Sequence, residues 1–179
     1  AHEAGLSAIA LTDHDTTAGV AGAAEAGAEL GLEVVPGIEV SSSFRDHEIH
    51  ILGLFVDTDS PSLQAALKEF RHHRDQRNQE MLGRFDAHGI HLTAEDLCAG
   101  NPDTVITRAH VARALLAKGL GPDLDHIFKK YLQYGGIYCP PKEFLPPEAV
   151  MEALLDSHAF VALAHPFQYK LGDKATEEL

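Results

Sequence analysis

The sequence has 179 residues, of which 45% are hydrophobic and 23% are charged, so a folded protein with a substantial core is expected. The formal net charge of −13 argues against broad, charge-driven binding of nucleic acid, and we expect no readout of DNA sequence. No apolar run approaches the roughly 20 residues that would span a bilayer, so we expect no membrane partner and a cytoplasmic location.

The first sixty residues alternate between strand-like and helix-like segments. Residues 7–12 form a short apolar run bounded by turn residues, as expected of a buried parallel strand. A helix follows through about Leu30, capped by Thr16 or Thr17. Two further strands are predicted, at residues 34–40 and 48–56. This strand–helix–strand order favours an α/β core.

From residue 61 onward the pattern becomes helical. Leu63, Leu67 and Phe70 recur at helical spacing, and the spacing resumes with Met81 and Phe85. Further helices are predicted at residues 93–98, 108–118, 123–131 and 146–157, and a strand at 160–164. We therefore expect an α/β core formed by residues 1–60 and 146–179, interrupted by a helical insertion subdomain at 61–145.

Ionisable side chains follow or end the first two predicted strands. Asp13 and His14 come directly after the first strand, where α/β folds usually build their sites. Alternatively, Asp15 or Thr16 caps the next helix and His14 is merely exposed in a turn. Glu39 ends an apolar strand, where a carboxylate is costly unless it is paired or bound to metal; it could equally be an exposed strand-end residue.

Two histidines have similar positions. In strand 48–56, alternation puts Glu48 and His50 on one face and Ile49 on the other. A histidine in a buried strand needs a hydrogen-bond partner or a metal, and an ordinary partner is the commoner case. His165 directly follows strand 160–164. Four candidates placed in or after strands make a stronger case for a shared site than any one of them.

The candidates are imidazole and carboxylate groups, which suit Mn²⁺, Zn²⁺ or Fe. Cys98 and Cys139 are isolated in the sequence, so neither a thiolate metal site nor a disulfide framework is expected. The pattern therefore predicts a hydrolytic metal site formed by His14, Glu39, His50 and His165.

Four sequence motifs surround these candidates. They are Ala-Leu-Thr-Asp-His-Asp-Thr-Thr at 10–17, Pro-Gly-Ile-Glu-Val-Ser at 36–41, His-Glu-Ile-His-Ile-Leu-Gly at 47–53 and Leu-Ala-His-Pro at 163–166. Together they resemble the motifs of the PHP (polymerase and histidinol phosphatase) superfamily. The chain is most similar to its bacterial 3′,5′-nucleotide bisphosphate phosphatases, whose members include a 5′→3′ exoribonuclease. Segments 105–110 and 128–132 of the expected insertion carry the same resemblance.

The resemblance implies part of a distorted (βα)₇ barrel with a helical insertion and up to three divalent ions, Mn²⁺ being favoured over Zn²⁺ or Fe. It implies that His14 ligates one ion, that Glu39 bridges two, and that His50 and His165 bind an ion shared with Glu39. Asp13 would act with His14 in catalysis by orienting its neighbours.

The resemblance also implies a substrate and the residues that bind it. Arg108, His110 and Lys170 would contact substrate phosphate. The implied reaction is hydrolysis of phosphate esters of nucleotides, either 3′,5′-bisphosphonucleotides or short RNA 5′ ends, by a metal-bound hydroxide.

The family's first strand carries Asp-x-His-x-His and its last carries Ser-Asp-x-His, and neither motif occurs in this sequence. Residues 1–6 have the pattern of a helix end closing on Gly5, and residues 174–179 that of a helix beginning, so a fragment of a longer protein is expected. Two alternatives remain: a catalytically incompetent piece that only binds metal or phosphate, and the PHP domain of a DNA polymerase. The oligomeric state is left open.

Overall fold

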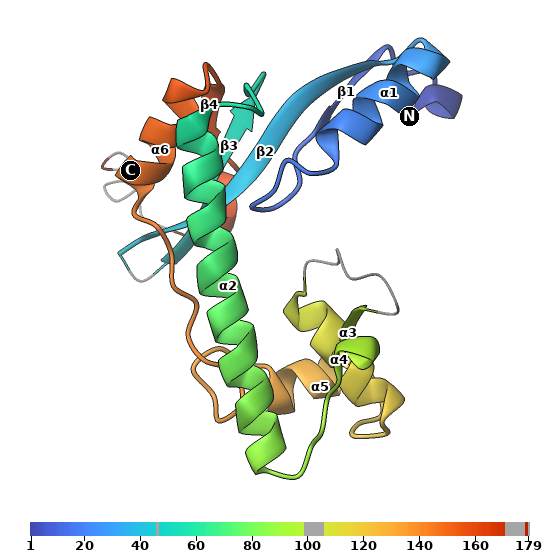
Figure 1. Cartoon of the computed structure of the whole chain (residues 1–179), viewed down its shortest axis with the longest axis vertical. Helices are drawn as coiled ribbons and strands as arrows, with labels where there is room; N and C mark the ends of the chain where they lie inside the picture. Colours follow the sequence, from blue (N-terminus) through green and yellow to red (C-terminus); the bar gives the residue numbers. More distant parts are fainter. Residues whose placement is uncertain (46, 99–105, 171–177, 179) are drawn as a thin grey trace. The chain divides into compact units, whose positions relative to one another are not determined.

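The computed structural model describes residues 1–45, 47–98, 106–170 and 178 (Figure 1). Contacts along the chain divide it into two compact units. The first unit comprises Ala1–Arg71 and Phe144–Leu179, and the second comprises His72–Glu143. The insertion boundaries expected from the sequence, 61 and 145, stay a prediction.

The first unit is built on a four-stranded sheet in the order β1-β2-β3-β4. The strands are β1 (Ala8–Leu11), β2 (Glu33–Phe44), β3 (His47–Leu54) and β4 (Phe160–Leu163), preceded by the 3-10 helix η1 (His2–Ala4). β1 is parallel to β2 because helix α1 (Val20–Leu30) makes the crossover between them, and the other two pairs are antiparallel. The predicted α/β class is confirmed.

Gly37 allows the end of β1 to lie close against β2. A Cβ atom at this position would lie 2.8 Å from Thr12 Cγ2, 3.0 Å from the Leu11 carbonyl oxygen and 3.1 Å from the Gly53 carbonyl oxygen. No side chain tolerates contacts this short with two backbone oxygens, so glycine is required here. The loop after β1 therefore begins beside Gly37 of β2, and Gly37 precedes Glu39 by two residues.

The core of the first unit consists of inward-facing strand residues and the apolar faces of two helices. These helices are α6 (Pro147–Asp156) and the first turns of α2 (Pro61–Ala87). The buried cluster contains Ile38, Val40, Ile51, Val56, Leu63, Leu67, Phe70, Leu145, Val150 and Leu154. Along β3, burial alternates as predicted: Ile49 and Ile51 are buried, and His50 lies on the opposite face. Packing therefore fixes which face of β3 carries the histidine.

The described part of the second unit is helical. It contains the remainder of α2, then α3 (Ala94–Cys98), α4 (Arg108–Ala117) and α5 (Leu124–Tyr131), which confirms the predicted helices. The buried cluster contains Met81, Phe85, Leu97, Val111, Ala112, Ala114, Leu115, Ile127, Tyr131, Leu132 and Cys139. Phe85 stacks on Tyr138, with ring centroids 4.6 Å apart and an interplanar angle of 6°. The described residues of this unit therefore form an apolar core of their own.

The predicted start of the first helix is wrong. α1 begins at Val20 with Gly19 as its N-cap, rather than at a cap on Thr16 or Thr17. The threonines form a turn instead: the Val20 amide donates to the Thr17 carbonyl oxygen at 3.0 Å, and the Ala18 amide donates to Thr16 Oγ1 at 3.2 Å. Threonine hydroxyls offer the backbone this alternative to a helical turn.

Two predicted strand ends are also shifted. β2 continues to Phe44 because it pairs with β3 as far as the Phe44–His47 pair, and β3 ends at Leu54 because Phe55 has a left-handed φ of 59°. Except for Glu178, the helix predicted at 174–179 lies outside the described residues, as does Val105 of the segment 105–110. Within the described ranges, no helix has both the length and the apolar character needed to cross a membrane. The cytoplasmic location stays a prediction.

Candidate metal centre

The loop after β1 continues to pair with β2 beyond the end of the strand. The Glu39 amide donates to the Asp13 carbonyl oxygen at 3.2 Å, and the Asp15 amide donates to the Glu39 carbonyl oxygen at 3.0 Å. These bonds form a parallel bridge between His14 and Glu39. Backbone hydrogen bonds therefore hold His14 beside Glu39.

Asp15 anchors the same loop through its side chain. The residue has a left-handed φ of 55° and is 7% exposed. Its Oδ1 accepts a hydrogen bond from the Ser41 amide at 2.7 Å, and its Oδ2 accepts one from Ser41 Oγ at 3.2 Å. Asp15 thus binds β2, and the alternative in which it caps α1 is wrong because the N-cap of α1 is Gly19.

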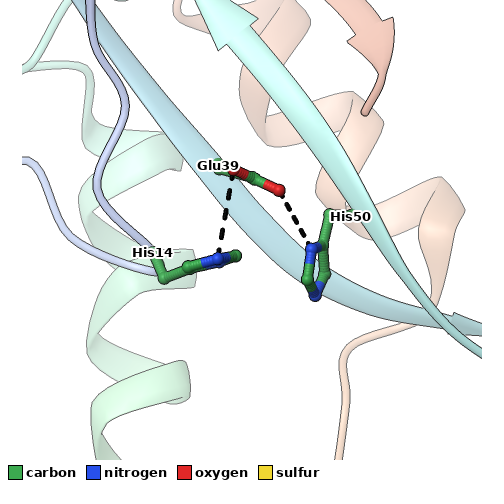
Figure 2. A group of neighbouring side chains, drawn as sticks. All are labelled: His14, Glu39 and His50. Atoms are coloured by element: carbon green, nitrogen blue, oxygen red, sulfur yellow. Dashed lines mark hydrogen bonds and ion pairs between the residues drawn. The ribbon is translucent and has the colours of Figure 1, made fainter. Parts of the chain in front are cut away.

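The side chains of His14, Glu39 and His50 point toward one another from the β1 loop, β2 and β3 (Figure 2). One ligand atom from each lies within 4.8 Å of the other two. His50 Nδ1 is 2.9 Å from Glu39 Oε1, and His14 Nε2 is 4.0 Å from Glu39 Oε2. Glu39 and His50 are 18% and 19% exposed, whereas His14 is 55% exposed. The group is therefore sheltered on one side and open to solvent at His14.

His165 joins this group from the end of β4. Its φ of 33° turns the chain into the 3-10 helix η2 (Pro166–Tyr169). Its Nε2 lies 2.9 Å from Glu39 Oε1 and 3.1 Å from His50 Nδ1. The four predicted ligands therefore form two overlapping groups. One oxygen of Glu39 faces His14, and the other faces His50 and His165.

The atoms Glu39 Oε1, His50 Nδ1 and His165 Nε2 form a triangle with edges of 2.9, 2.9 and 3.1 Å. Hydrogen bonds cannot occupy all three edges at once: a carboxylate only accepts, so if both histidines donate to it, their N–H groups face each other. A cation satisfies all three lone pairs together. These residues fit a divalent ion.

Tyr169 contacts both His50 and His165. Its hydroxyl accepts from the His50 amide at 2.8 Å and donates to the Ala164 carbonyl oxygen at 2.8 Å, and its ring centroid is 5.4 Å from that of His165. Burial raises the pKa of the Tyr169 phenol; the His50 amide lowers it, and the charges of Glu39 and Glu48 raise it. The phenol therefore stays protonated at neutral pH and can donate to Ala164.

The other predicted site residues of the first unit are exposed. Asp13 contacts β2 through its carbonyl oxygen, which accepts from the Glu39 amide. Lys170 follows Tyr169 directly and has a left-handed φ of 53°. Their roles in catalysis and phosphate binding stay predictions.

Arg108 and His110 belong to the second unit, at the start of α4. Arg108 Nη1 donates to the Leu132 carbonyl oxygen at 3.0 Å, and its guanidinium carbon lies 3.5 Å from the centroid of the Tyr134 ring. His110 Nδ1 accepts from the Thr107 amide at 3.1 Å, as part of a capping box at the start of the helix. Both side chains have contacts within this unit, and their proposed role in binding phosphate stays a prediction.

Two residues in contact with the candidate ligands or their loop were not selected from the sequence. Ser41 lies two residues after Glu39 on β2, and Tyr169 lies four residues after His165. Their proximity to predicted ligands was the only available signal, and serine and tyrosine are too common for that signal to single them out.

Curated relatives align with almost the whole chain, although no family model matches it. The chain is 35% identical over 173 residues to the 3′,5′-nucleoside bisphosphate phosphatase of Chromobacterium violaceum, and 35% identical over 176 residues to the 5′-3′ exoribonuclease Rnm of Escherichia coli. Both alignments cover 96% of this chain, but only 60% and 59% of those proteins. It is also 31% identical over 173 residues, 94% of the chain, to the phosphoribosyl 1,2-cyclic phosphate 1,2-diphosphodiesterase of Eggerthella lenta, of which 66% is covered. The chain thus spans about three fifths of the length of the first two relatives.

Two solved structures have the same fold. An amidohydrolase from Chromobacterium violaceum, whose structure holds sulfate and no metal, matches with a TM-score of 0.85 and 33% identity over 98% of this chain and 62% of that one. A protein from Bifidobacterium adolescentis described as a metal-dependent phosphoesterase matches with a TM-score of 0.86 and 27% identity, over 98% of this chain and 64% of that one.

The fold and the site together define an α/β protein that brings together imidazole and carboxylate side chains from two strands and from the segments that follow two others. Its curated relatives are named as a phosphatase, an exoribonuclease and a diphosphodiesterase, all of them hydrolases of phosphoric esters. The chain belongs to the PHP-type phosphoesterases, as its sequence motifs predicted.

Proposed function

We propose that the whole protein is a metal-dependent phosphoesterase that hydrolyses phosphate esters of nucleotides or RNA. The observation that carries this proposal is the convergence of four candidate ligands, two inside β2 and β3 and two after β1 and β4, in two overlapping groups that share Glu39. Relatives named as a nucleoside bisphosphate phosphatase and an exoribonuclease support the substrate class.

The four ligands would hold divalent ions in two neighbouring positions, one beside His14 and Glu39 and one among Glu39, His50 and His165. When bound, such ions activate water for attack on phosphorus and offset the negative charge that develops on the phosphoryl oxygens. Up to three ions are proposed for the whole protein. We propose Mn²⁺, with Zn²⁺ or Fe as alternatives, because imidazole and carboxylate donors suit these ions.

Glu39 has the central part in this arrangement. Each of its carboxylate oxygens faces a different set of histidines, so one side chain supplies negative charge to both positions. Backbone hydrogen bonds of Asp13 and Asp15, on either side of His14, hold Glu39 beside His14. Asp13, which precedes His14, would orient its neighbours in the metal-loaded protein.

Substrate phosphate would be bound by cationic or N–H-donating side chains. Because His110 Nδ1 accepts from the Thr107 amide, the neutral ring carries its proton on Nε2, which can donate to a phosphate oxygen. The Arg108 guanidinium has five N–H donors, of which the Leu132 carbonyl uses one. Lys170 would contribute an ammonium group. Each of these side chains is proposed, within its own unit, to contact phosphate of a 3′,5′-bisphosphonucleotide or of the 5′ end of a short RNA.

An assay of the whole protein with Mn²⁺ tests this proposal. A 3′,5′-bisphosphonucleotide should release inorganic phosphate, and a short 5′-phosphorylated oligoribonucleotide should release mononucleotides from its 5′ end. A Glu39→Gln variant should lose both activities, whereas Glu33→Gln, an exposed position at the start of the same strand, should keep them. No turnover of either substrate by the metal-loaded protein would refute the proposal.

A further inference from the structure

The hydrogen-bond pattern between β3 and β4 becomes irregular at His50, one of the candidate ligands. The two strands are antiparallel, and their register pairs Ile51 with Leu163, so His50 lies opposite Ala164. The Ala164 amide donates to the His50 carbonyl oxygen at 2.9 Å. In a regular hydrogen-bonded pair of this kind, the His50 amide would donate back to the Ala164 carbonyl oxygen.

The Tyr169 hydroxyl takes the place of that second bond. It accepts from the His50 amide at 2.8 Å and donates to the Ala164 carbonyl oxygen at 2.8 Å. One oxygen atom thus relays the missing ladder bond, and both backbone groups remain paired. The strands are joined directly on one side of the pair and through a side chain on the other.

The surrounding chain holds the hydroxyl in this position. Tyr169 is 9% exposed, and it returns to the sheet through η2, whose flanking residues His165 and Lys170 both have left-handed backbones. Its ring lies against the His165 ring, with centroids 5.4 Å apart. Tyr169 therefore contacts the backbone of one candidate ligand and the side chain of another.

We infer that Tyr169 is a positioning residue for the candidate metal centre: its hydroxyl sets the separation of the two backbone segments that carry His50 and His165. A direct ladder bond would draw the two backbones together, whereas the inserted oxygen keeps them apart by the length of two hydrogen bonds. The 3.1 Å approach of His50 Nδ1 to His165 Nε2 depends on that spacing. This inference rests on the proposed metal-dependent function.

Removal of the hydroxyl should weaken metal binding without unfolding the chain. In the whole chain, Tyr169→Phe should raise the dissociation constant for Mn²⁺ by about tenfold or more, the range seen when groups that orient ligands are lost. It should also change the visible absorption of bound Co²⁺, which reports ligand geometry. Tyr138→Phe, which removes the hydroxyl of a tyrosine packed against the core of the second unit, is the matched control and should alter neither readout.

A double-mutant cycle separates positioning from general stability. If Tyr169 acts through the two histidines, its replacement should cost less affinity in a His165→Ala background than in the parent chain. Equal losses in both backgrounds, or an unchanged Mn²⁺ affinity and Co²⁺ spectrum in Tyr169→Phe, would overturn the inference. Absence of metal binding by the parent chain would instead count against the proposed function.

A measurement on the unmodified chain covers the case in which Tyr169→Phe does not fold. Because the His50 amide donates to a buried hydroxyl, its hydrogen exchange should be as slow as that of the neighbouring β3 amides. Fast exchange at His50 beside protected neighbours would show that the relay is not formed, and would overturn the inference.

Discussion

Two arginines of the second unit and the candidate ligands of the first unit are partnered in different ways. In the second unit, Arg84 donates to two backbone carbonyls at 3.2 and 3.3 Å, and Arg108 donates to the Leu132 carbonyl oxygen at 3.0 Å. These cations are matched by acceptors of the same unit. In the first unit, Glu39 and the histidines around it bring lone pairs together, and a bound cation would match them.

This difference matters because composition alone does not separate the units. Both have fully buried apolar residues, such as Ile38 in the first unit and Leu115 in the second, and both contain histidines. What marks the first unit as the candidate site is the convergence of acceptor groups from two strands and from the segments that follow two others. Matched polar groups stabilise the unit that contains them, whereas converging acceptors are stabilised by a ligand from outside.

The largest effect is expected from a core substitution in the second unit. Leu115 is fully buried, so Leu115→Ala should lower the free energy of unfolding by about 2–5 kcal/mol, measured by urea denaturation. Leu124→Ala, at a position that is 40% exposed, should change it by no more than about 0.5 kcal/mol. The Mn²⁺ affinity of folded Leu115→Ala should stay within about twofold, because the ligands belong to the first unit. A large loss of affinity would show that the units do not act separately.

The next effect is expected from the shared carboxylate. Glu39→Gln removes the negative charge that faces all three histidines, so the Mn²⁺ dissociation constant should rise at least about a hundredfold, measured by titration calorimetry. Glu33→Gln makes the same chemical change at an exposed position of β2 and should leave the constant within about twofold. An Mn²⁺ affinity of Glu39→Gln close to that of the parent chain would show that the converging acceptors of the first unit do not need a cation.

The sequence predicted most of the elements and four candidate ligands that the structure brings together, because both depend on local patterns; metal binding by these residues stays a prediction. Alternation in β3 identified the face that carries His50, and His14 and His165 follow strands as predicted. The prediction that Glu39 ends its strand is wrong, because β2 continues to Phe44. Because strands of one sheet end close together, residues distant in the chain could be expected to meet.

The contacts that orient these ligands were not predictable in the same way. The Asp15–Ser41 bonds join residues 26 positions apart, and the Tyr169 relay reaches His50 across 119 positions. Such pairs depend on register and on left-handed turns, which leave no periodic signal in the sequence. The start of α1 was misplaced for a related reason, since Thr16 and Thr17 support a turn as readily as a cap.

A smaller effect on Mn²⁺ affinity is expected from Asp15, which anchors the loop after β1 to β2. Asp15→Asn keeps the shape of the side chain and tolerates the left-handed φ of 55°, but it removes the charge that accepts from the Ser41 amide and hydroxyl. We expect the Mn²⁺ dissociation constant to rise about tenfold, because His14 is less firmly held. Ser41→Ala removes only the 3.2 Å hydroxyl contact and should have a weaker effect. Equal affinity in Asp15→Asn and the parent would show that the backbone bridge alone positions His14.

The smallest effect concerns the response of the second unit to pH. The pKa of His110 is lowered from its ordinary 6.5, chiefly because burial disfavours the charged ring and also because Arg113 is near. As the pH falls below 6.5, the unfolded chain therefore takes up a proton before the folded chain does, and stability is lost. Protonation also removes the Nδ1 lone pair that accepts from the Thr107 amide. The urea concentration at the midpoint of unfolding should thus be lower at about pH 5.5 than at about pH 7.5.

His110→Asn tests the cause, because an asparagine oxygen can accept from the Thr107 amide but does not titrate. The difference between the two midpoints should shrink in this variant, by an amount equivalent to less than about 1 kcal/mol. An unchanged difference would assign the pH response to other groups. A smaller difference between the midpoints would show that His110 stabilises the second unit by accepting a hydrogen bond from the Thr107 amide. The lone pair of His110 thus has a donor within the protein, whereas the three histidines that converge on Glu39 would be matched by a metal ion.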